Sequence, residues 1–388
     1  MKDWNSVSDD TFRLAFRQWL TDNYPAEWRQ DAVRPFRRLS GADKVRWLRR
    51  LHDAGWRAPS WPREHGGMGL SFSKQLIYVQ ELELQRASRI VDFGEQMLGP
   101  IVMTFGSAAQ KAHILARILN CEEVWCQGYS EPNAGSDLAS LRTAALLDGD
   151  EFVVNGQKIW TTYAQDATHI FALVRTGQFP RKQQGISFLL IDLTSPGVQI
   201  RPIMNIAGEQ EFCEVFFSDV RVPVQNLLGT LNEGWSIAKT LLGHERIWVG
   251  SPGMCRAALA LARQLIETLS LSHDTRTVDQ LTELAADLHD YEALYDEICT
   301  DAAARGEIGP HVAMLKVLAT ELQQRICEFV SALSQECSGV VGATRIGDLE
   351  IDVHWTLMMS RPITIFGGAN EVQRDILAKA VLGLPGAR

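Results

Sequence analysis

The chain has 388 residues, which is too many for one small hydrophobic core and predicts two or three packed units. Its hydrophobic fraction of 46%, charged fraction of 22% and net charge of −9 indicate a globular protein and argue against a nucleic-acid-binding one. The longest apolar runs are far shorter than a membrane span, and the first residues contain no apolar segment of a secretory signal. We expect no binding to nucleic acid or membrane.

Seven cysteines are scattered along the chain without any Cys-x-x-Cys pair. Free thiols in a reducing cytosol explain this odd number best, so we expect a cytoplasmic protein. No His, Cys and Asp side chains cluster at metal-ligand spacing, so no metal site is expected.

Residues 1–121 predict an α-helical domain. Three runs have apolar residues at spacings of three and four, as amphipathic helices require. These runs are residues 13–24, 43–56 and 73–87. Eight arginines between Arg34 and Arg63 form either a solvated helix face or a surface that steers an acidic ligand.

Residues 122–231 predict a β domain. Short runs rich in β-branched and aromatic residues alternate with turn residues, which favours a small barrel or sandwich. The runs are residues 151–162, 168–176, 185–193, 197–203 and 213–223. Inside the first run, the dipeptide Asn155-Gly156 predicts a turn between two strands.

The segment from Trp125 to Thr162 contains a turn of small residues and ends with an aromatic residue followed by two hydroxyls. Small residues let the backbone approach a ligand closely, while a Trp ring covers a flat face. A planar cofactor with a polar edge, such as a flavin, suits that surface. An ordinary β-hairpin with two turns accounts for the same residues, and the pattern leaves both interpretations open.

Residues 232–388 predict an α-helical bundle, because long amphipathic runs follow one another with short links. The runs are residues 235–250, 256–269, 278–298, 310–333 and 371–382. Pro252 is expected to bend or interrupt the first helix.

Glu245 stands out on the first of these helices. It shares one stripe, at intervals of three and four, with apolar residues. These are Trp235, Ala238, Leu242 and Val249. A buried carboxylate has a raised pKa, which suits a general base, but a structural ion pair is the alternative. Arg246 is a poor partner for that pair, because adjacent helical residues point about 100° apart.

Taken together, the string SEPNAGSD, the string KIWTT and the order of helical, β and helical segments resemble the acyl-CoA dehydrogenase family over nearly the whole chain. The resemblance implies a mainly α fold with a β middle domain. Its parts would be an N-terminal α-helical domain (1–121), a small β-barrel or sandwich (122–231) and a C-terminal four-helix bundle (232–388).

The resemblance implies FAD-dependent desaturation of an acyl-CoA thioester to a trans-2-enoyl-CoA, with the β-hydride passing to flavin N5. The family draws its catalytic glutamate from one of two positions. One falls at Gly367 here, which has no carboxylate. The other, written L-x-x-E-R in the isovaleryl and long-chain branches, matches residues 242–246 and makes Glu245 the base. The backbone N–H of Gly367 is expected to stabilise the developing enolate.

The family's flavin contacts carry over to two groups of residues. They are Gln127, Tyr129, Ser130, Gly135, Ser136, Trp160, Thr161, Thr162, Asn370 and Glu371. Ser136 corresponds to a residue near the pantetheine arm of CoA, so Ser136 is also expected to contact substrate. Arg246 is a second expected substrate contact. Ala369 replaces a family Thr that touches flavin, which removes one contact.

Two family motifs that complete the flavin site of a neighbouring subunit are missing. Residues 269–281 contain no Phe-Gly, and residues 338–350 contain neither the Gln nor the Gly-Gly of those motifs. We therefore expect a hetero-oligomer with a second acyl-CoA dehydrogenase-like subunit, with a homo-oligomer as the alternative. The expected electron acceptor is an electron-transfer flavoprotein.

Two other functions fit parts of the sequence. A non-catalytic subunit would support the flavin site of a partner, and a flavin-dependent enoyl-CoA reductase would use the same fold. Fatty, branched, dicarboxylic and steroid-derived acyl-CoAs all stay open as substrates, because the pocket depends on how Phe93, Met97 and Trp248 pack.

Overall fold

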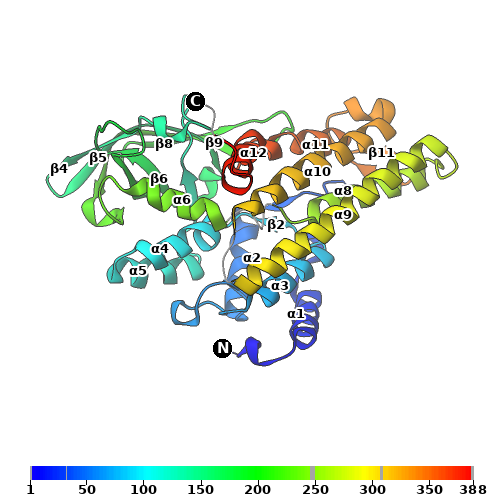
Figure 1. Ribbon diagram of the computed structural model, residues 1–388, viewed down its shortest axis with the longest axis horizontal. Helices are drawn as coiled ribbons and strands as arrows, with labels where there is room; N and C mark the ends of the chain where they lie inside the picture. Colours follow the sequence, from blue (N-terminus) through cyan, green and yellow to red (C-terminus); the bar gives the residue numbers. More distant parts are fainter. Residues whose placement is uncertain (1, 32, 245–249, 306–308, 386–388) are drawn as a thin grey trace. The chain divides into compact units, whose positions relative to one another are not determined.

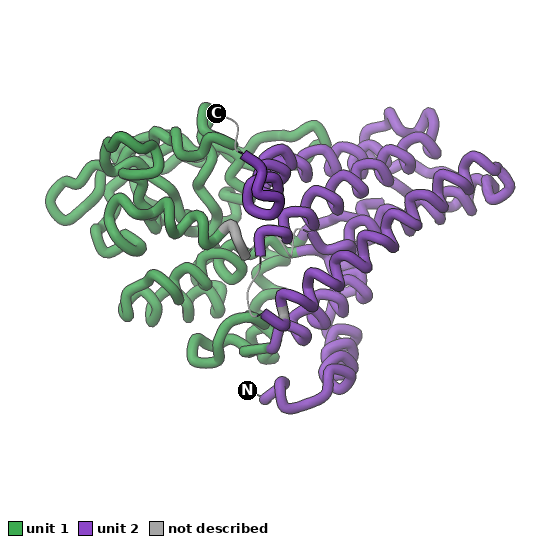
Figure 2. The backbone as a smooth tube through the Cα atoms, in the orientation of Figure 1, with its two compact units in different colours: residues 1–2, 39–70, 90–244 green, residues 3–38, 71–89, 245–388 purple. Residues whose placement is uncertain are grey.

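The computed structural model describes residues 2–31, 33–244, 250–305 and 309–385. The chain divides into two compact units, coloured separately in Figure 2. Unit 1 comprises residues 1–2, 39–70 and 90–244, and unit 2 comprises residues 3–38, 71–89 and 245–388. The N-terminal helical segment thus contributes to both units.

Unit 1 is built on an eight-stranded sheet of order β10-β7-β6-β4-β5-β9-β8, with β3 pairing in parallel with β6 (Figure 1). The strands are β3 (Trp125–Gly128), β4 (Ala144–Asp148), β5 (Glu151–Thr162), β6 (His169–Arg175), β7 (Ile186–Asp192), β8 (Val198–Ile203), β9 (Phe212–Pro223) and β10 (Leu227–Leu228). The five β-rich runs predicted from the sequence coincide with β5, β6, β7, β8 and β9, each to within one residue at either end.

The predicted turn at Asn155-Gly156 is wrong. β5 runs through both residues, and the hairpin between β4 and β5 turns at Gly149-Asp150. Gly156 instead marks a register shift of β5 against β9. Its φ is 149°, and a Cβ added there would lie 2.6 Å from Thr143 Oγ1. Glycine is favoured in β-bulges as well as in hairpin turns, and a bulge in β5 therefore explains Gly156.

The core of unit 1 lies on both faces of β6. Phe171 and Leu173 face a cluster shared with three helices, whereas Ile170 and Ala172 face a second cluster shared with β5 and β9. The three helices are α4 (Gly99–Phe105), α5 (Ala108–Leu119) and α6 (Gly234–His244). Figure 1 shows α6 between the strands and the α4–α5 pair, and α2 (Gly41–Asp53) belongs to the same unit.

Unit 2 is largely helical, and α10 (Ala313–Leu333) packs against α8 (Gly253–Thr268), α9 (Thr275–Arg305), α11 (Val353–Met359) and α12 (Asn370–Ile376). Helices α1 (Asp9–Asn23) and α3 (Phe72–Leu84) belong to the same unit. Four short strands are β1 (Arg38–Leu39), β2 (Arg89–Ile90), β11 (Thr344–Ile346) and β12 (Leu349–Ile351). Pro252 lies directly before α8 as its N-cap residue, so helical structure restarts there.

Helix α6, which the sequence groups with the bundle, packs against β7 within unit 1. Its buried face consists of Ile237, Ala238 and Leu241, and Trp235 packs partly buried against the same cluster. Two residues of the predicted stripe, Trp235 and Ala238, thus lie on the face that covers the sheet, whereas Glu245 and Val249 lie outside the described residues.

The described residues bear on three expectations, about membrane spans, metal ligands and cysteines. No helix within them is both long and apolar enough to cross a membrane. Within the same ranges, no group of three or more His, Cys, Asp or Glu side chains could hold a metal ion. All seven cysteines lie in described segments and are free thiols.

Candidate active site

Two of the predicted flavin-binding segments lie side by side in unit 1. Ile159 N–H donates to Ser130 O at 2.9 Å, and Lys158 Nζ donates to Tyr129 O at 3.2 Å. These bonds bring the end of β3 and the residues after it against the end of β5. Gln127, Tyr129 and Ser130 are thereby joined to Trp160, Thr161 and Thr162 in one region of the sheet.

A buried ion pair fixes the turn that follows β3. Glu131 Oε1 accepts from Lys158 Nζ at 2.8 Å, and the carboxylate also accepts from the N–H groups of Arg142 at 2.6 Å and Thr143 at 2.9 Å. Burial lowers the pKa of Lys158 to about 8, partly opposed by Glu131. Burial alone would raise the pKa of Glu131, but Lys158 and these donors outweigh it and hold the pKa below its ordinary value. Both groups are therefore ionised at neutral pH.

The tip of this turn is open. Glu131 and Ala134 close it with two reciprocal backbone hydrogen bonds of 3.0 Å. Gly135 and Ser136 are exposed beyond it, and apart from the chain neighbours of Gly135, no heavy atom of a described residue lies within 4 Å of the position that a Cβ on Gly135 would take. Backbone groups there are accessible to a ligand, as the prediction for these two residues requires.

Trp160 has an unusual backbone conformation. The pairing of β5 with β9 shifts register between Lys158 and Thr161, and Trp160 between them has a φ of 61°. Such left-handed conformations are rare for bulky residues and cluster at functional sites. The bulge holds the indole ring outward, so that 57% of Trp160 is exposed while its edge contacts Phe212.

The two hydroxyls after Trp160 differ in their surroundings. Thr161 is buried, and its Oγ1 has no hydrogen-bond partner among the described residues. Thr162 is half-buried. Thr162 is therefore better placed than Thr161 to offer a hydroxyl to a ligand beside the Trp160 ring.

These residues fit a flat group with a polar edge. The Trp160 ring is an exposed apolar face, Thr162 and Ser130 are partly accessible hydroxyls, and Gly135 leaves the turn open. The Gln127 amide lies 3.9 Å from Met97 Sδ, a weak contact. An isoalloxazine ring matches this combination of stacking surface and hydrogen-bonding groups.

Met97 belongs to a single π-helical turn, η4 (Gly94–Leu98), which lies beside β3. Met97 and Phe93, the described candidates for a pocket wall, are both buried in the cluster with α4 and α5. Isolated π-helical turns occur frequently at functional sites.

A buried charge cluster holds η4 in place. Arg57 donates to Asp92 at 2.8 Å and to Glu95 at 3.1 Å, and Asp92 accepts from Gly94 N–H at 3.1 Å. Two carboxylates thus face one guanidinium. Burial raises the pKa of Glu95 to about 7, with Arg57 opposing the rise and Asp92 adding to it.

Replacing Glu95 with Gln is expected to flatten the pH dependence of stability. Because the folded-state pKa of Glu95 exceeds the unfolded value of about 4.3, its contribution is full at low pH and is lost as pH rises through about 7. Between pH 5.5 and 8 the wild-type chain should lose on the order of 1–3 kcal/mol from this group, and Glu95→Gln should not. Thermal unfolding at both pH values measures this. The exposed Glu122→Gln is the control, and equal pH slopes for Glu95→Gln and wild type would contradict the assignment.

Glu245, Arg246 and Trp248 lie outside the described residues. The chain is described again from Gly250, whose carbonyl oxygen accepts from Tyr291 Oη. The predicted roles of Glu245 and Arg246 therefore stay predictions.

Gly367 lies in a loop of unit 2 between η10 (Pro362–Thr364) and α12. Gly367 and Gly368 have φ values of 64° and 83°, which favour glycine. Asn370 is buried, and its amide donates to Thr320 at 3.0 Å and Glu321 at 3.1 Å. Glu371 is exposed. Among the predicted flavin contacts of this unit, Asn370 is thus engaged with α10, whereas Glu371 is accessible.

Sequence reasoning missed a polar stripe on α10. Lys316, Thr320 and Gln323 are all buried although the helix is otherwise largely apolar on its buried side. Their spacing of four and three places them on one face. The spacing of these polar residues within an apolar run could have predicted the stripe from the sequence.

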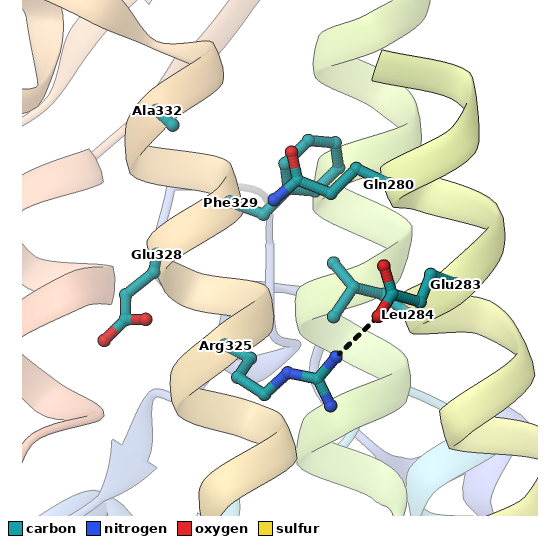
Figure 3. A pocket seen from close by; sticks show the side chains of 7 residues that line it. All are labelled: Gln280, Glu283, Leu284, Arg325, Glu328, Phe329 and Ala332. Carbon is teal, nitrogen blue, oxygen red and sulfur yellow. Dashed lines mark ion pairs between the residues drawn. The ribbon is translucent and has the colours of Figure 1, made fainter. Parts of the chain in front are cut away.

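A surface pocket of about 330 Å³ lies between α9 and α10 (Figure 3). It is lined by Gln280, Glu283, Leu284, Arg325, Glu328, Phe329 and Ala332. Arg325 forms ion pairs with Glu283 and Asp287, and Glu328 pairs with Arg361. The pocket contains none of the predicted site residues, and its charges are already paired.

Three family models match the chain in order. The N-terminal, middle and C-terminal domains of acyl-CoA dehydrogenase match residues 8–122, 126–220 and 232–382. Acyl-CoA dehydrogenase IpdE1 of Mycobacterium tuberculosis is 37% identical over 387 residues, which cover 97% of this chain and 98% of IpdE1.

Solved structures of the same kind superpose on the whole chain. The Tcur3481–Tcur3483 steroid ACAD matches with a TM-score of 0.81 and 28% identity, covering 100% of each chain. The ChsE4–ChsE5 complex from Mycobacterium tuberculosis matches with a TM-score of 0.80 and 30% identity over the same coverage.

The predicted fold class is confirmed, with helical N- and C-terminal domains and a β middle domain. The matched family consists of flavin-dependent oxidoreductases, which agrees with the surface formed by Trp160, Thr162 and Gln127. From its sequence and its fold, the chain belongs to the acyl-CoA dehydrogenase family.

Proposed function

We propose that this chain is the catalytic subunit of an FAD-dependent acyl-CoA dehydrogenase that desaturates a thioester between its α and β carbons. The observation that carries the proposal is the junction of residues 127–130 with residues 160–162, through Lys158 and Ile159. That junction creates a surface on which the ring of Trp160 is held outward at a residue with a strained backbone.

The chain's own residues have distinct roles in this proposal. Trp160 covers the ring of the cofactor, while Gln127, Tyr129, Ser130 and Thr162 bind its polar edge. Bound FAD supplies the acceptor for the hydride that leaves the β-carbon. The remaining contacts are Gly135, Ser136, Thr161, Asn370 and Glu371, of which Thr161 and Asn370 act by supporting their neighbours.

Proton removal is assigned to Glu245. A carboxylate in an apolar site has a pKa raised toward neutrality and can accept the weakly acidic α-proton. The N–H of Gly367 donates to the thioester oxygen, where negative charge develops as the proton leaves. Arg246 and Ser136 orient the CoA thioester.

We further propose a steroid-derived acyl-CoA as the substrate class to test first, with an electron-transfer flavoprotein as acceptor. The support is the likeness to the Tcur3481–Tcur3483 steroid ACAD over the whole chain. Reduction of an artificial acceptor by purified enzyme, measured with steroid-derived, straight-chain, branched and dicarboxylic acyl-CoAs, tests both parts. No turnover with any saturated acyl-CoA, but oxidation of NAD(P)H with an enoyl-CoA, would favour the reductase instead.

The proposed assembly is a hetero-oligomer with a second acyl-CoA dehydrogenase-like subunit. Its support is the lack of the two donor motifs in residues 269–281 and 338–350, together with likeness to the ChsE4–ChsE5 complex. For the chain itself, we propose domain boundaries after residues 121 and 231.

Purification alone and after co-expression with such a subunit is expected to give different flavin contents. Absorbance near 450 nm per chain should rise several-fold in the complex, because the partner supplies the missing half of the flavin site. Equal, full flavin in the chain alone would favour a homo-oligomer. If flavin binding and activity in the complex depended only on the partner's catalytic residues, this chain would instead be a non-catalytic subunit.

A further inference from the structure

Lys316 is a buried lysine near the start of α10, with 1% of its surface exposed. Its Nζ donates to Gly368 O at 2.6 Å, to Asn370 Oδ1 at 3.1 Å and to Thr364 O at 3.4 Å. All three oxygens belong to residues 364–370, the segment that contains Gly367. The side chain thus connects the central helix of unit 2 to one short loop.

Burial of this ammonium has a high free-energy cost that the loop contacts offset. Removing an ammonium from water costs several kcal/mol even after relaxation, and Lys has three donors but no acceptor. A Met or Leu would fill the same helical position without that cost. Retaining Lys316 is therefore consistent with a requirement for the loop conformation rather than for the stability of α10.

The loop needs such a restraint because it contains two adjacent glycines with positive φ. Glycine loses more conformational freedom on folding than any other residue, so this segment is intrinsically loose. Hydrogen bonds from a cation are shorter and stronger than neutral ones. Gln373 adds two weaker contacts, from Nε2 to Gly367 O at 3.2 Å and to Gly368 O at 3.3 Å.

These contacts set the orientation of the loop's peptide groups. In a trans peptide the C=O and N–H point in opposite directions. Since the carbonyl oxygens of Gly367 and Gly368 face Gln373 and Lys316, the N–H groups of Gly368 and Ala369 face away from them. The peptide that follows Gly367 is thereby anchored, and its position limits how the Gly367 N–H, one peptide earlier, can be oriented.

We propose that Lys316 is a positioning residue for dehydrogenation, which holds the loop of residues 364–370 so that the Gly367 N–H stays oriented toward the thioester oxygen. This rests on the proposed function, in which that N–H stabilises the enolate. A donor that is fixed before reaction needs no reorganisation as charge develops, so its loss of order lowers kcat more than substrate affinity.

Lys316→Met tests this in the flavin-loaded enzyme. We expect kcat to fall by about 10- to 100-fold, because a disordered donor forfeits part of the roughly 100- to 1,000-fold that one such donor supplies. The KM should change by less than about threefold. Amide hydrogen exchange, read by mass spectrometry in peptides covering residues 364–370, should become at least several-fold faster, while exchange in β5 and β6 should be unchanged.

Lys74→Met is the matched control. Lys74 is also a buried lysine of unit 2, but it pairs with Asp9 of α1 at 2.6 Å and makes no described contact with residues 364–370. It should lower thermal stability without changing kcat or exchange in the loop. If Lys316→Met behaved like Lys74→Met, Lys316 would be a purely structural residue and the proposal would be wrong.

Gln373→Leu provides the same test without removing a buried charge, in case Lys316→Met fails to fold. It should raise exchange in residues 364–370 and lower kcat by a smaller factor, since it loses two neutral hydrogen bonds; unchanged exchange and kcat would count against the proposal. Failure of the proposed function is distinguishable, because wild-type enzyme would then be inactive with every acyl-CoA. Exchange in the loop would still decide whether Lys316 orders it.

Discussion

Replacing Glu245 with Gln is expected to lower kcat for acyl-CoA dehydrogenation by about 100- to 10,000-fold, the contribution that a positioned general base usually makes. The amide keeps the shape of the side chain but cannot accept the α-proton. Bound flavin should be nearly unchanged, because the proposed cofactor contacts in unit 1, from Gln127 to Thr162, lie elsewhere in the chain. Stopped-flow loss of absorbance near 450 nm on adding substrate measures the reductive step directly.

Glu233→Gln is the control for this substitution. Glu233 is an exposed carboxylate directly before α6, so its loss should leave kcat within about twofold of wild type. Normal turnover in Glu245→Gln would assign the base to another residue. Loss of flavin together with activity would instead indicate that Glu245 is a structural ion-pair member.

A double variant distinguishes a missing base from a damaged site. Glu245→Gln combined with Gly367→Glu places a carboxylate at the family's other position for the base. Recovery should be partial, because Gly367 has a φ of 64° and a residue with a Cβ adopts that conformation at a cost of about 1–2 kcal/mol. No recovery at all, with flavin retained, would mean that the two positions do not serve the same proton here.

The strands show how far local sequence pattern determines this fold. β6 and β7 are apolar at nearly every position because both of their faces are buried, and such runs are recognisable in sequence. The turn at Asn155-Gly156 was mispredicted because a hairpin turn and a bulge require the same kind of residue. Pairing of β5 with β9, which is distant in sequence, decides between them.

The candidate site was predictable where it follows one continuous motif, and not where it depends on distant partners. Residues from Gln127 to Thr162 could be proposed together because the whole string resembles one family. The partnership of Glu131 with Lys158 could not, since an isolated Glu and Lys in a sequence indicate solvated positions far more often than a buried pair. Lys316 was missed for the same reason.

Replacing Lys158 with Met is expected to destabilise the fold by about 3–5 kcal/mol, the usual effect of removing one member of a buried ion pair. Glu131 would keep its two backbone donors but lose its cation, and Tyr129 O would lose its contact with Lys158. Because that contact joins the two segments proposed to bind flavin, flavin affinity should fall as well. Urea unfolding at pH 7 and flavin content after dialysis measure the two effects.

The pH dependence of this loss separates the charge from the packing. In wild type the pKa of Glu131 is held below its ordinary value, so its contribution is present above about pH 4.3 and is lost as pH falls through the folded-state pKa. Without Lys158, burial is expected to raise the pKa of this carboxyl, so that it takes up a proton more readily as the pH falls. The destabilisation by Lys158→Met should therefore be smaller at pH 5 than at pH 7, and adding Glu131→Gln should recover part of it at pH 7.

Lys182→Met is the matched control, because Lys182 pairs at 2.8 Å with Asp137 in the same turn but the two side chains are 63% and 61% exposed. A solvent-exposed pair contributes about 0–1 kcal/mol, so this variant should unfold almost like wild type at both pH values. A pH-independent loss in Lys158→Met, unrelieved by Glu131→Gln, would show that packing of the lysine stem, rather than the buried charge pair, holds the SEPNAGSD turn against β5.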